Sequence, residues 1–475
     1  MFNISDTFYY VLIGYFVIIL GIGLWTGRGE KSKNSEEFLV AGRSIGAVVG
    51  GAALAATQMS AGTFVGSMGV HWMTGVSYHW FWPGLWLGWL ISALWVAPKM
   101  QKFRALTVPD YIGQRYNSKL AKGIAAVLIF VALTVSLIGQ YVAGGILLQT
   151  VFGIPMLYGS IITIAITVIY TFKGGMKASA YSDFVQALIM AGCFFAAVPI
   201  LIIQAGGMEH IAAFITELDP RLTGFYYSVK DLFGFAMVFG VSMAVMPYEL
   251  AKMYTLKSPR TVRLAIGFGM VFQAIVALSV SLSGTVMRSL FPTLNTGDAA
   301  SSLMAATVVP PLVGALLVVA ILAAIMSTVS GVIIVSSSAI SHDIYGLLKP
   351  NATDKEKMRM NKIWCLIAGV IPMFFAIRPF DMVQFIIILQ SSLIAAFFFP
   401  AVAIGLNWKG ATKAGAIASM IVGFCTVIIW REIGNPLGLH EVIPGVVFSC
   451  IVYYVVSKFT KPLPREALLP FFKDV

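Results

Sequence analysis

Runs of about twenty apolar residues, separated by short polar connections, recur from one end of this chain to the other. A helix needs such a run to cross the hydrocarbon core of a bilayer. The pattern predicts thirteen membrane-spanning helices and leaves no gap that would hold a large water-soluble domain. The predicted helices cover residues 7–26, 44–73, 75–98, 120–150, 154–172, 183–205, 228–255, 260–291, 312–343, 359–378, 380–406, 411–431 and 440–459.

The basic residues test this count and indicate an orientation, because Lys and Arg accumulate in cytoplasmic loops. With the N-terminus outside, thirteen helices place all but five of the 32 Lys and Arg residues on the cytoplasmic side. The five on the outer side are Arg221, Lys230, Arg288, Arg378 and Arg431. One missed or invented helix would scramble this distribution. We therefore expect an outside N-terminus and a cytoplasmic C-terminus in the cell (plasma) membrane.

Helix lengths suggest an internal repeat. Helices 120–150 and 312–343 are much longer than a bilayer requires, and they lie five helices apart. The helix two places before each of them, 44–73 and 228–255, contains glycine, polar residues or proline, which disfavour a continuous apolar helix. We expect these two helices to be broken.

This pattern predicts an all-α membrane protein built from two five-helix units, residues 44–205 and 228–406. Because five is odd, the second unit starts from the opposite side, which gives the inverted repeat common in secondary transporters. One extra helix, 7–26, precedes the repeat, and two, within 411–459, follow it. The alternative is that the lengths coincide by chance and the polar residues only aid packing.

Composition supports a bilayer rather than a water-soluble protein. Hydrophobic residues make up 59% of the 475 residues and charged residues only 11%, whereas soluble domains carry about 25% charged residues. The net charge of +12 does not indicate nucleic acid, because the basic residues lie in short gaps between apolar runs. The first run, 7–26, lacks a basic region before it and a small-residue cleavage site after it, so we expect a retained helix.

The most informative segment is "ALAATQMSAGTFVGSMG", from Ala53 to Gly69. Polar side chains at this depth are costly and usually face protein or a water-filled cavity. The glycines permit an unwound turn, and the freed carbonyl oxygens would be good ligands for a hard cation. Close helix packing explains the small residues equally well.

A second polar stretch lies in helix 312–343, where Ser327 and Thr328 are adjacent and Ala324 lies one turn earlier. Each hydroxyl could simply bond the carbonyl a turn back, or it could offer a neutral oxygen to a monovalent cation. No carboxylate lies near either stretch in the sequence. A neutral oxygen cage suits Na⁺ better than Ca²⁺ or Mg²⁺, which usually need carboxylates.

Over roughly residues 7–460 the chain resembles the sodium/solute symporter family, its pantothenate and proline branch in particular. Four strings carry the likeness: "AAIMST" from Ala323, "HDIY" from His342, "GGMKASAYSDFVQ" from Gly174 and "VPDYIGQRY" from Val108. The resemblance implies the LeuT-type fold and co-transported Na⁺. It also implies five sodium ligands: the carbonyls of Ala56, Met59 and Ala324 and the hydroxyls of Ser327 and Thr328.

Three further polar residues are candidates. Asp183 matches the acidic residue of the family signature, which implies a place on the inward ion path, although a helix N-cap is an equal alternative. Glu249 and Lys252 are three residues apart on helix 228–255. We expect them to form a structural ion pair on one helix face, with a proton-coupling role for Glu249 as the alternative.

A solute should bind at mid-membrane depth between the broken helices. Six residues are candidate lining positions: Thr63, Trp82, Gln140, Phe239, Ser242 and Gln390. Trp82 belongs to an aromatic cluster that could instead form an interfacial belt. Sugar-carrying members of the family have a Glu-Gln pair where this chain has Gly62 and Thr63, so a sugar would lose polar partners.

The sequence therefore predicts a sodium-coupled symporter for a small carboxylate-bearing nutrient such as pantothenate or proline. Its expected partners are that solute, sodium and the lipid bilayer, with no nucleic acid. An ion-independent or proton-coupled solute carrier is the alternative. A membrane enzyme is not expected, because the five histidines are scattered and no His, Asp and Glu set clusters in the apolar runs.

Overall fold

The computed structural model of this protein describes residues 5–26, 35–103 and 105–472. Within them the chain is helical apart from turns and one isolated bridge between Ile45 and Leu256. The helices are α1 (Asp6–Thr26), α2 (Ser35–Val40), α3 (Ala47–Gln58), α4 (Met68–Thr74), α5 (Phe81–Ile91), α6 (Ala97–Phe103), α7 (Val108–Arg115), α8 (Lys119–Phe152), α9 (Met156–Gln204), α10 (Met208–Leu218), α11 (Val229–Val245), α12 (Pro247–Tyr254), α13 (Pro259–Leu290), α14 (Ala300–Leu303), α15 (Pro311–Ser338), α16 (Tyr345–Leu348), α17 (Asp354–Ala376), α18 (Val383–Phe398), α19 (Lys413–Glu432), α20 (Val442–Phe459) and α21 (Arg465–Leu468).

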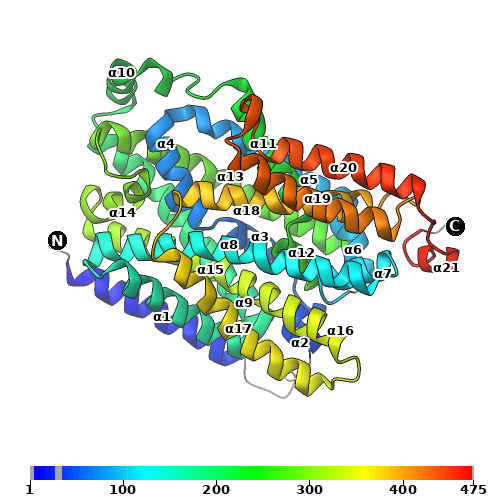
Figure 1. The fold of residues 1–475 in the computed structure, drawn as a ribbon. Helices are drawn as coiled ribbons and strands as arrows, with labels where there is room; N and C mark the ends of the chain where they lie inside the picture. The colour runs from blue at the N-terminus through cyan, green and yellow to red at the C-terminus, as the bar shows by residue number, and fades with distance from the viewer. Residues whose placement is uncertain (1–4, 27–34, 104, 473–475) are drawn as a thin grey trace.

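The long helices run side by side in one bundle, with α1 beginning at the end that carries α10 and α14 (Figure 1). The last short helix, α21, lies at the opposite end (Figure 1). This arrangement fits an odd number of crossings, and which end faces the cytoplasm stays a prediction. Five basic residues of the predicted cytoplasmic segments lie outside the described residues: Arg28, Lys31, Lys33, Arg104 and Lys473.

In the described part of the chain, eleven helical segments are long and apolar enough to cross a membrane. The predicted helices 44–73 and 154–172 are represented by the shorter apolar helices Ala47–Gln58 and Met156–Ile169. The segment Gly62–Phe103 runs on without a gap through the end of one predicted helix and all of the next. The chain is therefore a multi-span membrane protein, and a total of thirteen crossings stays a prediction.

Two helices form the centre of the bundle. The most apolar windows of Pro311–Leu348 and Val383–Ile404, which contain α15 and α18, are 83% and 89% buried, whereas that of α1 is 22% buried. The central helix α15 packs against α8, α9 and α1, and α18 packs against α8 and α11. Residues of α15 and α18 thus face protein on almost every side, which is where polar side chains can be tolerated inside a membrane.

Both helices that we expected to be broken are broken. Residues 44–73 contain α3, which ends at Gln58, and a new helical segment that starts at Ala61. Residues 228–255 contain α11 and α12, separated at Met246, which has φ −60° and ψ 118°. Pro247 explains this second break, because proline lacks an N–H donor and forces the preceding residue into an extended conformation.

A kink divides α9 at Gly175, where φ is 56° and ψ is −148°. A side chain disfavours this conformation. A Cβ atom there would also lie 2.7 Å from the carbonyl oxygen of Phe38. Met156–Ile169 and Gly175–Gln204 therefore count as separate apolar helices.

A seam of glycines holds α5 against α11. A Cβ atom added to Gly84 would lie 2.6 Å from the Cα of Ala236, and one added to Gly240 would lie 2.9 Å from the carbonyl oxygen of Gly84. Such close backbone approach is the means by which membrane helices gain packing contacts without a hydrophobic driving force. The seam fixes α5 beside the first half of a broken helix.

Substituting Gly84→Val should therefore lower the melting temperature of the detergent-purified protein, because overpacking costs about 1–3 kcal/mol. Gly267→Val is the matched control, since no described atom apart from the adjoining backbone of its own helix and its two chain neighbours lies within 4 Å of a Cβ at that position. Equal melting temperatures for the two variants would contradict the importance of this seam.

Candidate functional site

The first helix break is held together by side chains. Met59 has φ −73° and ψ 82°, so its carbonyl turns away from the axis of α3. Ser60 Oγ accepts the backbone N–H of Gly62 at 3.0 Å, and Gln140 Oε1 accepts that of Ala61 at 3.0 Å. Backbone groups in a bilayer must be paired within the protein. Ser60 and Gln140 therefore supply partners that the interrupted helix lacks.

Two hydroxyls of α15 meet the carbonyl oxygens at this break. Ser327 Oγ lies 2.7 Å from the carbonyl oxygen of Ala56 and 2.9 Å from that of Ala324. Thr328 Oγ1 lies 2.7 Å from the carbonyl oxygen of Thr57 and 3.1 Å from that of Ala324. Since each hydroxyl has only one proton to donate, its remaining lone pairs are available to a cation. Five neutral oxygens from two helices converge here.

Four of the five predicted sodium ligands are joined by these hydrogen bonds: Ala56, Ala324, Ser327 and Thr328. The fifth, Met59, lies at the break itself. All are buried, and the set contains no carboxylate. The arrangement suits a monovalent cation rather than Ca²⁺ or Mg²⁺, whose sites usually contain carboxylates.

An ion pair lies beside this oxygen cluster. The Lys252 ammonium contacts Asp183 Oδ2 and Thr57 Oγ1, and both charged side chains are buried, 3% and 0% exposed. Ser179 Oγ also donates to Asp183 Oδ2, at 3.0 Å. Burying two charges is unfavourable unless they are paired and hydrogen-bonded. The alternative of a helix N-cap at Asp183 is wrong, because the residue lies inside the helix Gly175–Gln204 rather than at its start. Asp183 instead has a specific cationic partner.

The predicted ion pair between Glu249 and Lys252 is wrong. Lys252 points to Asp183 on α9, and both carboxylate oxygens of Glu249 lack a hydrogen-bond partner among the described residues, although Glu249 is fully buried. The three-residue spacing allows the pair on an isolated helix. The break at Met246 instead brings α12 against the ends of α3 and α15. The Lys252 ammonium therefore pairs with Asp183 on another helix instead of with Glu249.

A small cavity lies between the two broken helices. Its volume of about 20 Å³ leaves room for about one water molecule, so an amino-acid-sized solute requires the surrounding helices to move apart. Its lining is neutral, without Asp, Glu, Lys or Arg. The lining residues are Gln58, Ser60, Gly62, Thr63, Ser67, Phe81, Trp82, Phe239, Met243, Tyr248, Gln384, Ile387 and Ser391.

Three of the six candidate solute residues, Thr63, Trp82 and Phe239, line this cavity. Trp82 is 1% exposed and faces the protein interior rather than an interfacial belt.

The other three candidates lie outside the cavity lining and have local partners. Gln140 pairs with the amide of Ala61, Ser242 Oγ lies 3.4 Å from the carbonyl oxygen of Phe239 on its own helix, and Gln390 Nε2 lies 3.5 Å from Met246 Sδ. Each of these three side chains therefore contacts a backbone or side-chain group of the protein instead of lining the cavity.

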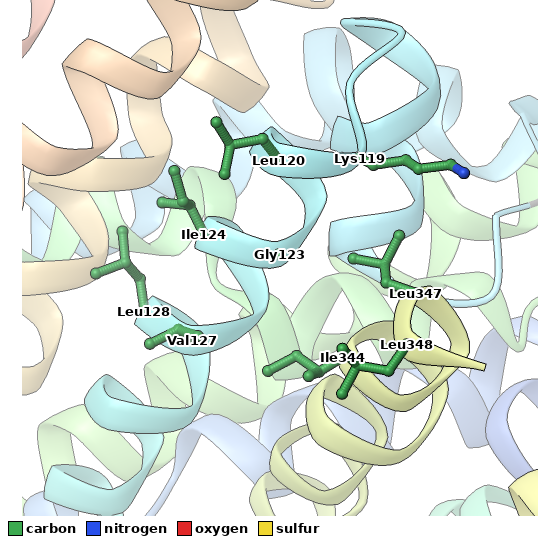
Figure 2. Close-up of a pocket in the computed structure, with 9 residues that line it drawn as sticks. All are labelled: Lys119, Leu120, Gly123, Ile124, Val127, Leu128, Ile344, Leu347 and Leu348. Carbon is green, nitrogen blue, oxygen red and sulfur yellow. The ribbon is translucent and has the colours of Figure 1, made fainter. Parts of the chain in front are cut away.

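A larger hollow of about 540 Å³ lies elsewhere, between the start of α8 and the segment around α16 (Figure 2). Aliphatic side chains line it, including Leu120 and Leu348, which are 64% and 79% exposed. Figure 2 shows these side chains along the two helices, with Lys119 as the one charged residue. An open aliphatic groove lacks the converging polar groups of a solute site.

Asp110, His342 and Asp343 form a cluster whose ligand atoms lie within 4.8 Å of one another. Lys122 already contacts Asp110 and lies 3.2 Å from Asp343, while His342 Nε2 is 2.9 Å from Asp110 Oδ2. Burial would raise the pKa of Asp110, but the His342 hydrogen bond and the Lys122 charge lower it well below its ordinary range. The cluster thus ties α7 to α8 and to the segment after α15 through charges that already have partners.

Sequence reasoning missed several polar residues around the cavity. Gln58 accepts a hydrogen bond from Gln273, and Gln384 Nε2 donates to Tyr78 at 2.7 Å. Gln384 Oε1, by contrast, has no partner among the described residues. The signal available in the sequence was an amide side chain inside an apolar run, which marks a position facing protein or a cavity.

Asp298 is a buried acid that contacts the start of α18. It is 3% exposed, and its Oδ2 accepts the backbone N–H of Val383 at 3.0 Å. Burial raises the pKa of Asp298 to about 6; the Val383 bond opposes this shift and the charge of Asp381 adds to it. The folded protein therefore holds this proton more tightly than the unfolded chain, where the pKa is about 3.9.

Stability should consequently fall as the pH rises from about 4 to about 6, because the folded state must release a proton that it binds more tightly than the unfolded state. Asp298→Asn, which keeps an acceptor for Val383, should remove this part of the pH dependence of the melting temperature. Glu217→Gln, a change at an exposed acid, is the control. An Asn variant with the wild-type pH profile would refute this role for Asp298.

Comparison with known proteins gives a consistent result. The profile of the sodium:solute symporter family matches residues 38–423. Sodium/proline symporter 2 of Staphylococcus saprophyticus is 31% identical over 478 residues, covering 95% of this chain and 93% of that protein. The sodium/proline symporter of Staphylococcus aureus is also 31% identical, over 480 residues and with the same coverage.

Solved structures agree on the fold. A Na⁺-coupled sialic acid symporter in a substrate-bound outward-open state superposes with a TM-score of 0.84 at 18% identity, covering 97% of this chain and 99% of that one. A nucleobase-cation-symport-1 family transporter superposes with a TM-score of 0.58 at 13% identity, covering 91% and 97%. At these identities the likeness concerns the fold alone, and it confirms the LeuT-type fold.

Proposed function

Because the chain belongs to the sodium:solute symporter family, we propose that it is a sodium-coupled secondary active symporter that imports L-proline or a closely similar small carboxylate-bearing nutrient by alternating access. The observation that carries the sodium part is the convergence of the Ser327 and Thr328 hydroxyls on the carbonyls of Ala56, Thr57 and Ala324. Met59 completes the proposed ligand set beside Ala56, Ala324, Ser327 and Thr328.

The proposed solute site is the neutral cavity between the broken helices. Two half-helices begin at its wall, since Gly62 and Tyr248 both line it and lie at the starts of their segments. Helix N-termini favour a carboxylate, so a zwitterionic solute needs no buried arginine there. Thr63, Trp82 and Phe239 supply polar and apolar contacts. The names of the similar sodium/proline symporters favour proline over pantothenate.

The remaining architecture is part of the same proposal. We assign residues 44–205 and 228–406 to two inverted repeats, with the N-terminus outside and the C-terminus in the cytoplasm. The matching breaks after Gln58 and after Val245 support this assignment, because each falls in the first helix of a unit. Asp183, paired with Lys252 beside the hydroxyls, is the proposed contact for sodium on its inward route.

Replacing both hydroxyls, Ser327→Ala with Thr328→Ala, should abolish sodium-stimulated uptake of L-[³H]proline into proteoliposomes, because two of five ligand oxygens are lost. Ser338→Ala is the matched control, since among the described residues its hydroxyl bonds only the carbonyl of Val335 on its own helix. Sodium dependence that survives in the double variant would refute this cation site.

The solute can be identified by thermal stability, because a ligand that binds only the folded protein stabilises it. L-Proline should raise the melting temperature of the purified protein more in NaCl than in KCl, and pantothenate should not. Stabilisation by pantothenate would reassign the solute. Equal stabilisation in both salts would favour an ion-independent or proton-coupled carrier instead.

A further inference from the structure

Lys252 places a fixed positive charge next to the proposed sodium ligands. Its ammonium contacts the hydroxyl of Thr57, the residue that directly follows Ala56. On the α15 side, a Cβ atom at Gly331 would lie 3.4 Å from Lys252 Cε, so the lysine stem fits against a position one turn after Ser327. The ammonium is therefore packed between α3 and α15, the two helices that supply the proposed sodium ligands.

A chain of polar contacts joins this ion pair to the ligand set. Ser179 Oγ donates to Asp183 Oδ2 at 3.0 Å and lies 3.0 Å from Ser330 Oγ. Ser330 Oγ is also 2.9 Å from the carbonyl oxygen of Ser327, and its single proton can go to only one of these two oxygens at a time. A change in the partner of Asp183 can thus reach the backbone of Ser327 through direct contacts. Asp183 Oδ1 has no hydrogen-bond partner among the described residues, so this carboxylate has capacity for a further cation.

Glu249 is a second carboxylate that the Lys252 ammonium can reach. It lies one turn before Lys252 on α12, it is fully buried, and neither carboxylate oxygen has a hydrogen-bond partner among the described residues. Side chains three residues apart on a helix can reach each other. Burying a carboxyl group without a partner is unfavourable, so a function that needs Glu249 in another state explains why it is there.

We propose that Lys252 is a tethered cation that changes partner during transport, from Asp183 to Glu249, and thereby frees Asp183 to receive the departing sodium ion. This inference rests on the proposed sodium symport. In the present arrangement the ammonium occupies the carboxylate and repels a second cation. Movement of Lys252 to Glu249 removes that repulsion and exposes a negative charge beside the ligands, which draws sodium out of the neutral cage. In this step only ion pairs and hydrogen bonds change partners, and no covalent bond forms or breaks.

Two measurements on purified protein distinguish the role of Glu249 from that of Lys252. The sodium half-saturation is read from the rise in melting temperature with NaCl alone, which needs no solute. The maximal rate is read from sodium-driven L-proline uptake into proteoliposomes. If the two residues exchange the ammonium, one substitution changes the maximal uptake rate and the other changes the sodium half-saturation. If they are merely structural, both substitutions lower the melting temperature without this difference between rate and affinity.

Glu249→Gln keeps the shape but cannot hold the ammonium as an ion pair, so the maximal rate should fall about fivefold or more while the sodium half-saturation stays within about twofold. Lys252→Met removes the ammonium and leaves Asp183 free for sodium, so the half-saturation should fall about tenfold. Lys257→Met, the same change at an exposed lysine five residues later, is the matched control and should leave both measurements at wild-type values.

A wild-type rate for Glu249→Gln, or an unchanged sodium half-saturation for Lys252→Met, would overturn the partner exchange. If Lys252→Met does not fold, the double variant Lys252→Met with Asp183→Asn removes both charges of the ion pair. A wild-type sodium half-saturation in this double variant supports the proposal, and a higher sodium half-saturation contradicts it. Failure of the proposed symport itself is distinguishable, because the wild type would then show neither NaCl-induced stabilisation nor sodium-driven uptake.

Discussion

A helix can be interrupted inside a bilayer only where the protein itself pairs the backbone groups that the interruption frees. The rest of this structure depends on that constraint. At the first break, Gln140 accepts the amide of Ala61, and the hydroxyls of Ser327 and Thr328 approach the carbonyls that α3 leaves at its end. These partners come from α8 and from α15, which is one of the two most buried helices of the bundle.

The groups that stabilise the break are also the groups that can do chemistry. A carbonyl oxygen that accepts a serine proton can equally accept a cation, so the first break places potential sodium ligands where the interrupted helix meets α15. The charged residues follow the same logic. Lys252 and Asp183 are tolerated at this depth because they neutralise each other. Neither carboxylate oxygen of Glu249 has a hydrogen-bond partner in the described chain, and this unpaired acid is the basis of the proposed second position of the lysine.

Particular residues show how far sequence reasoning reaches. The break at Met246 follows from Pro247, because proline alone decides the local backbone. Ser327 and Thr328 were found because adjacent hydroxyls in an apolar helix are unusual. Gln140 was predicted to line the solute site, and its pairing with the backbone of Ala61 was not foreseen, since that amide is 79 residues away in the chain. Lys252 was given the wrong partner for the same reason: the i to i+3 rule holds for an isolated helix and ignores the neighbouring α9.

By itself, the sequence determined the class of the protein, the position of the two broken helices, and the residue types able to hold a cation. These properties depend on local composition and on backbone preferences that act over a few residues. The tertiary structure alone decided which residues line the cavity, which carbonyls meet the two hydroxyls, and that Lys252 pairs with Asp183 while Glu249 has no hydrogen-bond partner among the described residues. Such choices depend on which helix lies opposite, and no local pattern encodes the neighbour across a bundle.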